Sequence, residues 1–81
     1  MSLLTRGEII VSLYESARDI DLSHEDALQT GTHAFDKMYT DVQVIWYTVY
    51  FYCRKTFSPE ESVNRADVYL TKVQAILDGQ G

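Results

Sequence analysis

The sequence predicts an all-α fold: a compact four-helix domain over residues 1–81, made of two consecutive helical hairpins. Three observations support this prediction. Helix-start motifs occur at four places, each followed by apolar residues at helical spacing. A single proline and four glycines provide few of the turns that a many-stranded β fold needs. Two of the start motifs also recur 35 residues further along the chain.

The first helix is expected over residues 5–19. Thr5 and Glu8 match a capping box, in which the threonine hydroxyl accepts from the Glu8 amide while the glutamate reaches back to the Thr5 amide. The apolar positions that follow at helical spacing are Ile10, Leu13 and Ala17.

The second helix is expected over residues 23–38, with Ser23 as its N-cap. Glu25 and Asp26 lie in its first turn, where negative charge favours the helix dipole. Its predicted apolar stripe is Leu28, Gly31, Phe35 and Met38.

The third helix is expected over residues 41–55. Thr40 and Gln43 again have the spacing of a capping box, with Thr40 as the N-cap. The apolar phase of the second helix continues through this segment, however, so one long helix over residues 24–55 remains an alternative.

The fourth helix is expected over residues 58–77. Ser58 is its N-cap, Pro59 occupies the first helical position and Glu61 closes a capping box. Asp78 and Gly79 are expected to end it, leaving a short flexible tail at 79–81. Its predicted apolar stripe is Val63, Ala66, Leu70, Val73 and Leu77.

The spacing of these motifs suggests an internal repeat. Thr5 and Thr40 are 35 residues apart, as are Ser23 and Ser58, and periods near this length are typical of stacked helix–turn–helix units. The period and the position of Trp46 resemble tetratricopeptide repeats in architecture. Tyr50 and Tyr69 occupy two positions where that motif has small residues, and only Ser62, with Ala27 in the first unit, fits it, so no family membership follows.

The charge is distributed unevenly. The net charge is −5; residues 1–41 hold eight acidic and three basic side chains, whereas residues 42–81 hold four of each. An acidic first hairpin repels phosphate backbones and anionic membranes and attracts basic partners. We therefore expect no direct binding to nucleic acid or membranes. The longest apolar run, 42–53, is also shorter than the roughly 18–20 residues of a membrane span.

No residue is assigned to catalysis, to a cofactor or to a metal. Asp19 to Ser23 begins like a calcium loop, but His24 stands where glycine is required. His24 and His33 are nine residues apart and face opposite sides of a helix. Cys53 is the only cysteine, and without a credible secretory signal we expect it to be a buried thiol of a cytoplasmic protein.

The most informative segment is 42–53, which is apolar around nearly the whole helix. Ile45, Val49 and their neighbours can serve the internal core. An outer stripe of Val44, Tyr47 and Phe51 then remains, and it either completes the core or faces a partner.

The sequence therefore favours a small non-enzymatic interaction module that binds a partner protein, as an inhibitor, immunity factor or adaptor of the kind encoded by phages and mobile elements. The expected contacts are Val44, Tyr47 and Phe51, through which it could also form a homodimer, and Glu25 and Asp26 toward a basic partner. One alternative is a small-ligand-binding oligomer with an aromatic interface pocket. The other is a small enzyme using His33, Asp36 or Cys53.

Overall fold

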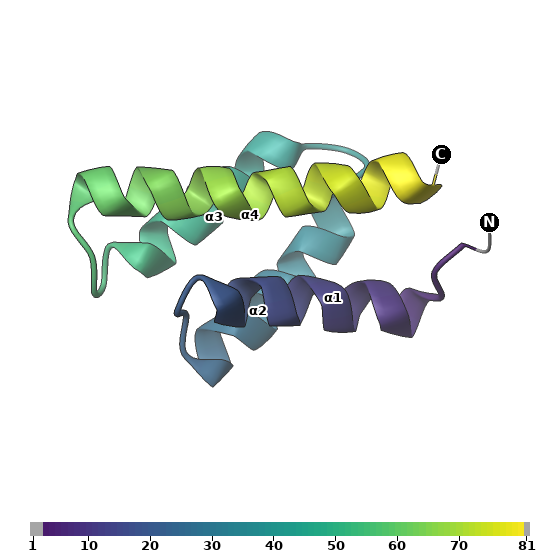
Figure 1. Ribbon diagram of the computed structural model, residues 1–81, viewed down its shortest axis with the longest axis horizontal. Coiled ribbons are helices and arrows are strands. Elements are labelled where there is room, and N and C mark those ends of the chain that lie inside the picture. Colours follow the sequence, from purple (N-terminus) through teal and green to yellow (C-terminus); the bar gives the residue numbers. More distant parts are fainter. Residues whose placement is uncertain (1–2, 81) are drawn as a thin grey trace.

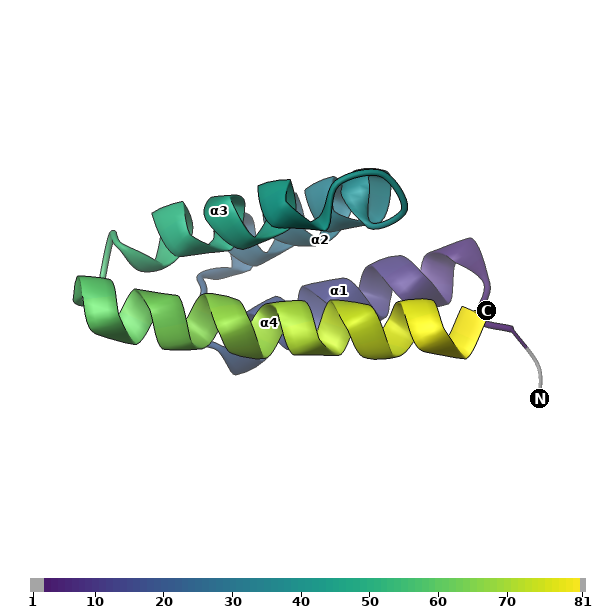
Figure 2. The same cartoon turned by 90° about the horizontal axis from the view of Figure 1, so that it is seen from above.

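The computed structural model describes residues 3–80 as four helices that form two helical hairpins (Figure 1). The first hairpin packs α1 against α2, and the second packs α3 against α4; contacts of α2 with α3 and of α1 with α4 join them. α1 and α4 lie on one side of the domain, and α2 and α3 cover the other (Figure 2). The predicted four-helix fold is confirmed. The helices are α1 (Arg6–Asp19), α2 (His24–Lys37), α3 (Val42–Cys53) and α4 (Pro59–Gln80).

The first and last helices contact each other, so the two hairpins close into a bundle that measures 39 × 21 × 18 Å. The start of α1 and the end of α4 consequently lie at the same end of the molecule (Figure 1). This closed arrangement differs from the open stacking of a repeat solenoid, in which each unit contacts only its neighbours.

Three of the four predicted helix caps are present. Thr5 Oγ1 accepts from the Glu8 amide at 3.2 Å, and Glu8 Oε1 accepts from the Thr5 amide at 3.0 Å. These hydrogen bonds lower the pKa of Glu8 below its ordinary value. The hydroxyls of Ser23 and Ser58 each accept from the amide three residues on. Local sequence therefore defines where α1, α2 and α4 begin.

The cap predicted at Thr40 is wrong, although the break between α2 and α3 is real and excludes one long helix. The amides of Thr40 and Asp41 both donate to the Lys37 carbonyl, at 3.0 and 2.8 Å, and thereby close the C-terminus of α2. Thr40 is thus used to end one helix. Asp41 is the N-cap of α3, and its side chain makes no capping hydrogen bond.

The predicted end of the fourth helix is also wrong. α4 continues through Asp78 and Gly79 to Gln80, three residues beyond the predicted end at Leu77. Gly79 does not adopt the positive φ of a glycine that terminates a helix, so it extends the last turn. The predicted tail is helical at 79–80, and Gly81 lies outside the described residues.

The buried faces of α2 and α4 agree with the predicted stripes in part, since Gly31, Met38, Ala66 and Val73 are buried. Leu28 is half exposed, Val63 is exposed, and Phe35, Leu70 and Leu77 are only partly buried. Small side chains occupy much of the centre because the helices approach one another closely. The buried positions are Ala27, Thr30, Gly31 and Ala34 on α2, Met38 at its C-cap, and Ser62, Ala66, Tyr69 and Val73 on α4.

Gly31 lies where α1 and α2 approach each other closely. A Cβ atom at this position would lie 3.1 Å from the Tyr14 backbone nitrogen and 3.3 Å from its Cα. These neighbours are backbone atoms that cannot move aside independently. The packing of α1 on α2 therefore favours glycine at position 31.

The burial pattern repeats along the chain. Buried positions of α2 recur in α4 after 35 residues, as Ala27 and Ser62 do, whereas those of α1 recur in α3 after 36, as Leu13 and Val49 do. One residue more therefore separates the equivalent buried positions of the first hairpin, Ala17 and Ala27, than those of the second, Cys53 and Ser62. The loop between α1 and α2 contains Asp21, whose φ is 68°, and it closes α1 through a hydrogen bond from the Leu22 amide to the Ala17 carbonyl.

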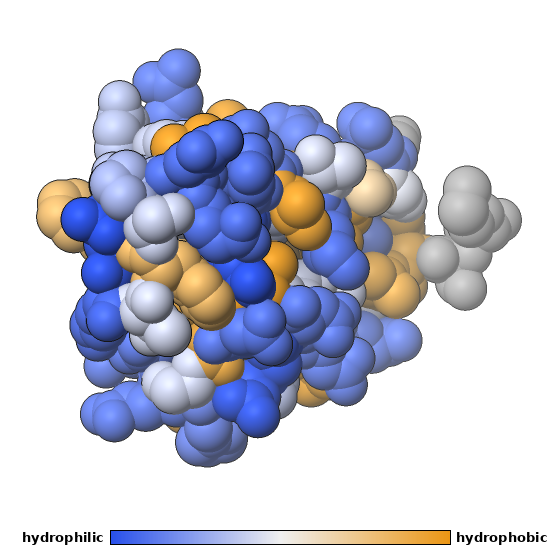
Figure 3. All heavy atoms as spheres, turned by 60° about the vertical axis from the view of Figure 1, so that its left-hand side comes forward, coloured by the Kyte–Doolittle hydropathy of each residue, from blue (hydrophilic) through white to orange (hydrophobic). Residues whose placement is uncertain are grey.

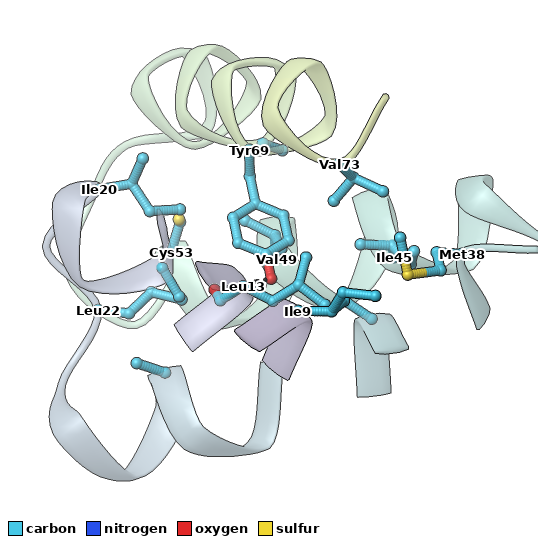
Figure 4. Close-up of a cluster of buried hydrophobic side chains, with 14 residues drawn as sticks. Ile9, Leu13, Ile20, Leu22, Met38, Ile45, Val49, Cys53, Tyr69 and Val73 are labelled. Atoms are coloured by element: carbon cyan, nitrogen blue, oxygen red, sulfur yellow. Dashed lines mark hydrogen bonds between the residues drawn. The ribbon is translucent and has the colours of Figure 1, made fainter. Parts of the chain in front are cut away.

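Tyr69 is the largest fully buried side chain and links the two hairpins (Figure 4). It reaches from α4 toward α1 and donates its hydroxyl to the Leu13 carbonyl at 3.1 Å. Burial raises the pKa of this phenol above its ordinary value. Leu13 and Val49 are also fully buried around it.

Ion pairs also connect the hairpins, and each joins a basic residue of the second half to an acid of the first. The pairs are Lys55 with Asp26 (3.2 Å), Arg65 with Asp21 (2.9 Å) and Lys72 with Asp19 (3.6 Å). All three are partly exposed, so each stabilises the fold by at most about 1 kcal/mol. The acidity of the first hairpin is therefore partly neutralised within the molecule.

Candidate interaction surface

α3 contains no charged residue between Val42 and Cys53. Its β-branched and aromatic residues have modest intrinsic helix propensity, so packing stabilises the helix more than local sequence does. Ile45, Val49 and Cys53 form its buried edge. The other side chains of α3 are partly buried or exposed.

The outer stripe predicted from the sequence lies on the accessible side of α3. The side chains of Tyr47 and Phe51 are 59% and 72% exposed, and Val44 is partly buried. Tyr47 and Phe51 are therefore not part of the internal core. Phe51 is the most exposed large apolar residue among those described.

Four aromatic rings of α3, which we call the aromatic cluster, contact one another along the helix. Trp46 and Tyr50 stack with an interplanar angle of 7° and centroids 5.4 Å apart. Tyr47 meets Trp46 edge to face at 5.3 Å, and Phe51 meets Tyr50 edge to face at 6.4 Å. These contacts restrict the exposed rings of Tyr47 and Phe51, so less side-chain entropy is lost if a partner binds there.

A groove runs beside the aromatic cluster, between α3 and α4. It has a volume of about 300 Å³ and is lined by Gln43, Trp46, Tyr47, Asp67 and Leu70. The Trp46 indole Nε1 donates to Asp67 Oδ1 at 2.7 Å across the groove. The sequence analysis missed Asp67, because this pairing depends on how α4 packs against α3 and no local motif encodes it.

Glu25 and Asp26, the predicted contacts for a basic partner, lie in the first turn of α2. Glu25 is exposed. Asp26 accepts from Lys55 through both carboxylate oxygens at 3.2 Å, and its side chain is only 19% exposed. Glu25 is thus accessible to a partner, whereas the Asp26 carboxylate already forms an ion pair with Lys55 of the second hairpin.

The end of the molecule that carries the α1–α2 and α3–α4 loops is mainly hydrophilic, with hydrophobic side chains scattered among polar ones (Figure 3). A polar pocket of about 290 Å³ between these loops includes Arg18, Asp21, Asp26 and Tyr52. The charged side chains of this pocket already have partners within the protein. Arg18 donates to the Leu22 carbonyl, and Asp21 and Asp26 form ion pairs.

The remaining candidate residues do not form a reactive cluster. His24 Nδ1 lies 2.7 Å from the Tyr14 hydroxyl, and His33 lies elsewhere on α2, beside Asp36 on the outer face. Cys53 is fully buried, and its pKa is raised mainly by desolvation, an effect that the charge of Arg65 partly offsets. Within residues 3–80, no three His, Cys, Asp or Glu side chains are arranged to hold a metal ion.

Comparisons with known proteins gave no match: no protein-family model fits the chain, and neither the curated proteins nor the solved structures include one similar to it. Among the helices of residues 3–80, none combines the length and apolar character required to cross a membrane.

Proposed function

We propose that this protein acts by binding another protein through the exposed side of α3. The observation that carries the proposal is the exposure of Tyr47 and Phe51, 59% and 72%, on a helix without a single charged residue. Aromatic residues are enriched at the centres of protein interfaces, where charged residues are depleted. The outer side of α3 has this composition.

The rigidity of the aromatic cluster also supports the proposal. The two exposed rings are held by edge-to-face contacts with Trp46 and Tyr50, which belong to the packed part of the domain. A surface that is already ordered binds with a smaller loss of conformational entropy than a flexible one. An inhibitor, an immunity factor and an adaptor each act by such binding, without chemistry of their own.

The charge of the molecule favours a basic partner. The net charge is −5, and three of the seven Lys and Arg side chains are ion-paired with the protein's own acids. Glu25 and Asp41 are exposed acids outside those pairs. The resulting negative potential accelerates association with a positively charged protein and repels nucleic acid.

The same face could pair with a second copy of the chain. Asp41 is the N-cap of α3 and Arg54 is its C-cap, and both residues are exposed. Antiparallel pairing of two α3 helices about Tyr47 would place the Asp41 of each copy near the Arg54 of the other. This geometry is the arrangement that we propose for a homodimer.

Affinity capture from the source cells, combined with sedimentation of the purified protein, tests the proposal. Phe51→Glu places a charge at an exposed position of α3, and Val68→Glu places one at an exposed position of α4 as a control. We expect wild type and Val68→Glu to retain the same partner or dimer, and Phe51→Glu to lose it while remaining helical by circular dichroism. Undiminished binding by folded Phe51→Glu would refute this site.

A further inference from the structure

The protein uses one combination of groups twice to hold its own cations: an aromatic ring beside a carboxylate. The Lys55 ammonium lies 5.0 Å from the Tyr52 ring centroid and pairs with Asp26. The Arg65 guanidinium lies 3.8 Å from the Phe57 ring centroid and pairs with Asp21 and Glu61. In each case a cation–π contact and an ion pair act on the same charge.

The groove between α3 and α4 contains the same groups without a cation. Its walls include the rings of Trp46 and Tyr47, and Asp67 supplies a carboxylate. Over the described residues 3–80, no lysine or arginine forms an ion pair with Asp67, and none lies over the Trp46 ring. Among the described residues, Asp67 is the only charged one that lines the groove.

The geometry of the groove suits a cationic side chain. The Trp46 and Tyr47 rings are nearly perpendicular, at 88°, with centroids 5.3 Å apart, and both line the groove. The indole N–H holds Asp67 through Oδ1 at 2.7 Å, which fixes the carboxylate at the edge of the groove. Oδ2 has no hydrogen-bond partner within the described residues and can accept from a ligand. Tryptophan is the aromatic residue that attracts cations most strongly.

We infer that this groove binds an arginine or lysine side chain of the partner protein. The inference rests on the proposed function and specifies the chemistry that the partner presents beside the aromatic cluster. Arginine fits best, because its planar guanidinium can stack on an aromatic ring and donate to a carboxylate at the same time. The partner is therefore basic at the residue that enters the groove, as well as in its overall charge.

Trp46 is the only tryptophan, so its indole N–H gives a single NMR signal that reports directly on the groove. The probe is Nα-acetyl-arginine methylamide, and the matched neutral probe is Nα-acetyl-citrulline methylamide, which has nearly the same shape without the charge. We expect the arginine compound to shift the Trp46 signal in a saturable manner, and the citrulline compound to bind at least about fivefold more weakly.

Three variants separate the contribution of the groove to binding from that of the general negative charge. Asp67→Asn keeps an oxygen that can accept from the indole but removes the charge, and it should weaken binding of the arginine probe by about fivefold or more. Asp36→Asn removes an equal charge from the exposed face of α2 and should leave that binding unchanged. Tyr47→Leu removes one wall at an exposed position and should weaken it as well.

Equal binding of arginine and citrulline, or equal losses in Asp67→Asn and Asp36→Asn, would overturn the inference. Capture of the partner protein by the variants distinguishes a failure of this inference from a failure of the proposed function. If Phe51→Glu abolishes capture of the partner but Asp67→Asn does not weaken it, α3 is the binding site and the groove holds no cation. If the groove binds arginine but Phe51→Glu captures the partner normally, the proposed function fails instead.

Discussion

Replacing Tyr69 with phenylalanine tests how the two hairpins are held together. The substitution removes a buried hydrogen bond from the hydroxyl to the Leu13 carbonyl, whose length is 3.1 Å, and keeps the ring. The Leu13 carbonyl remains inside α1, where the helix supplies another donor. The substitution leaves no buried polar group without a partner. It should therefore lower the free energy of unfolding by about 1 kcal/mol at neutral pH, the contribution of one intramolecular hydrogen bond.

The dependence of this loss on pH provides a sharper test. Burial raises the pKa of the Tyr69 phenol, so the folded protein keeps its proton at pH values where the unfolded chain releases it. Stability is then fully present below the unfolded pKa of about 10 and decreases as the pH rises above it. At pH 11 this effect has lowered the unfolding free energy of wild type by about 1.4 kcal/mol, and it is absent from the phenylalanine variant.

The two stability curves should therefore cross between about pH 10.5 and 11, with the variant less stable below the crossing and more stable above it. Urea titrations followed by far-ultraviolet circular dichroism can measure this, since 1 kcal/mol corresponds to about 1 M in the midpoint. Tyr47→Phe, at an exposed tyrosine, is the control and should follow wild type. Parallel curves for wild type and Tyr69→Phe up to pH 11 would refute the buried environment assigned to Tyr69.

Four other substitutions test the packing and the α4 cap. Gly31→Ala should destabilise by about 1–3 kcal/mol, because its Cβ would press on the Tyr14 backbone at 3.1 Å; a more stable variant would show that α1 and α2 are further apart. Leu13→Ala should cost about 2–5 kcal/mol and clearly more than Leu70→Ala, because Leu13 is fully buried and Leu70 is not; the reverse order in urea melts would contradict the core described. Ser58→Ala should cost about 0.5–2 kcal/mol in the same melts through loss of the α4 cap, and no loss would mean that the cap is dispensable.

The helix starts could be predicted from the sequence because capping is local. Thr5, Ser23 and Ser58 each bond to an amide three residues away, and such contacts are visible as sequence motifs. Thr40 shows where this reasoning fails. The same residue pattern closes the end of α2, where the Thr40 amide donates to the Lys37 carbonyl at 3.0 Å.

The buried faces were harder to predict, since they depend on the distances between helices. Hydrophobic periodicity favoured Leu28 and Leu70, but the closely packed centre admits Ala27 and Ser62, which were not in the predicted stripes. The close approach of α1 to the backbone at Gly31 explains this preference for small residues on α2. Sequence periodicity gives the approximate side of a helix, and packing then selects the residues on it.

The candidate site could be predicted only in part. The uncharged composition of α3 indicated a helix with more apolar surface than the core needs, and the exposure of Tyr47 and Phe51 agrees with it. The ion pair of Asp26 with Lys55 could not be predicted, because it joins residues 29 positions apart. Asp67 was missed for the same reason, since it meets Trp46 only after α3 and α4 have packed.

The most direct test of the central claim is the unfolding free energy of Tyr47→Glu, measured together with its binding to the partner or to a second copy. A carboxylate at a side chain that is 59% exposed faces water in the free protein, but it would be buried at the centre of the proposed interface. The account predicts stability within about 0.5 kcal/mol of wild type and loss of binding. An unfolded variant would contradict the exposed position of this residue, and a folded variant that still binds would contradict the role of α3.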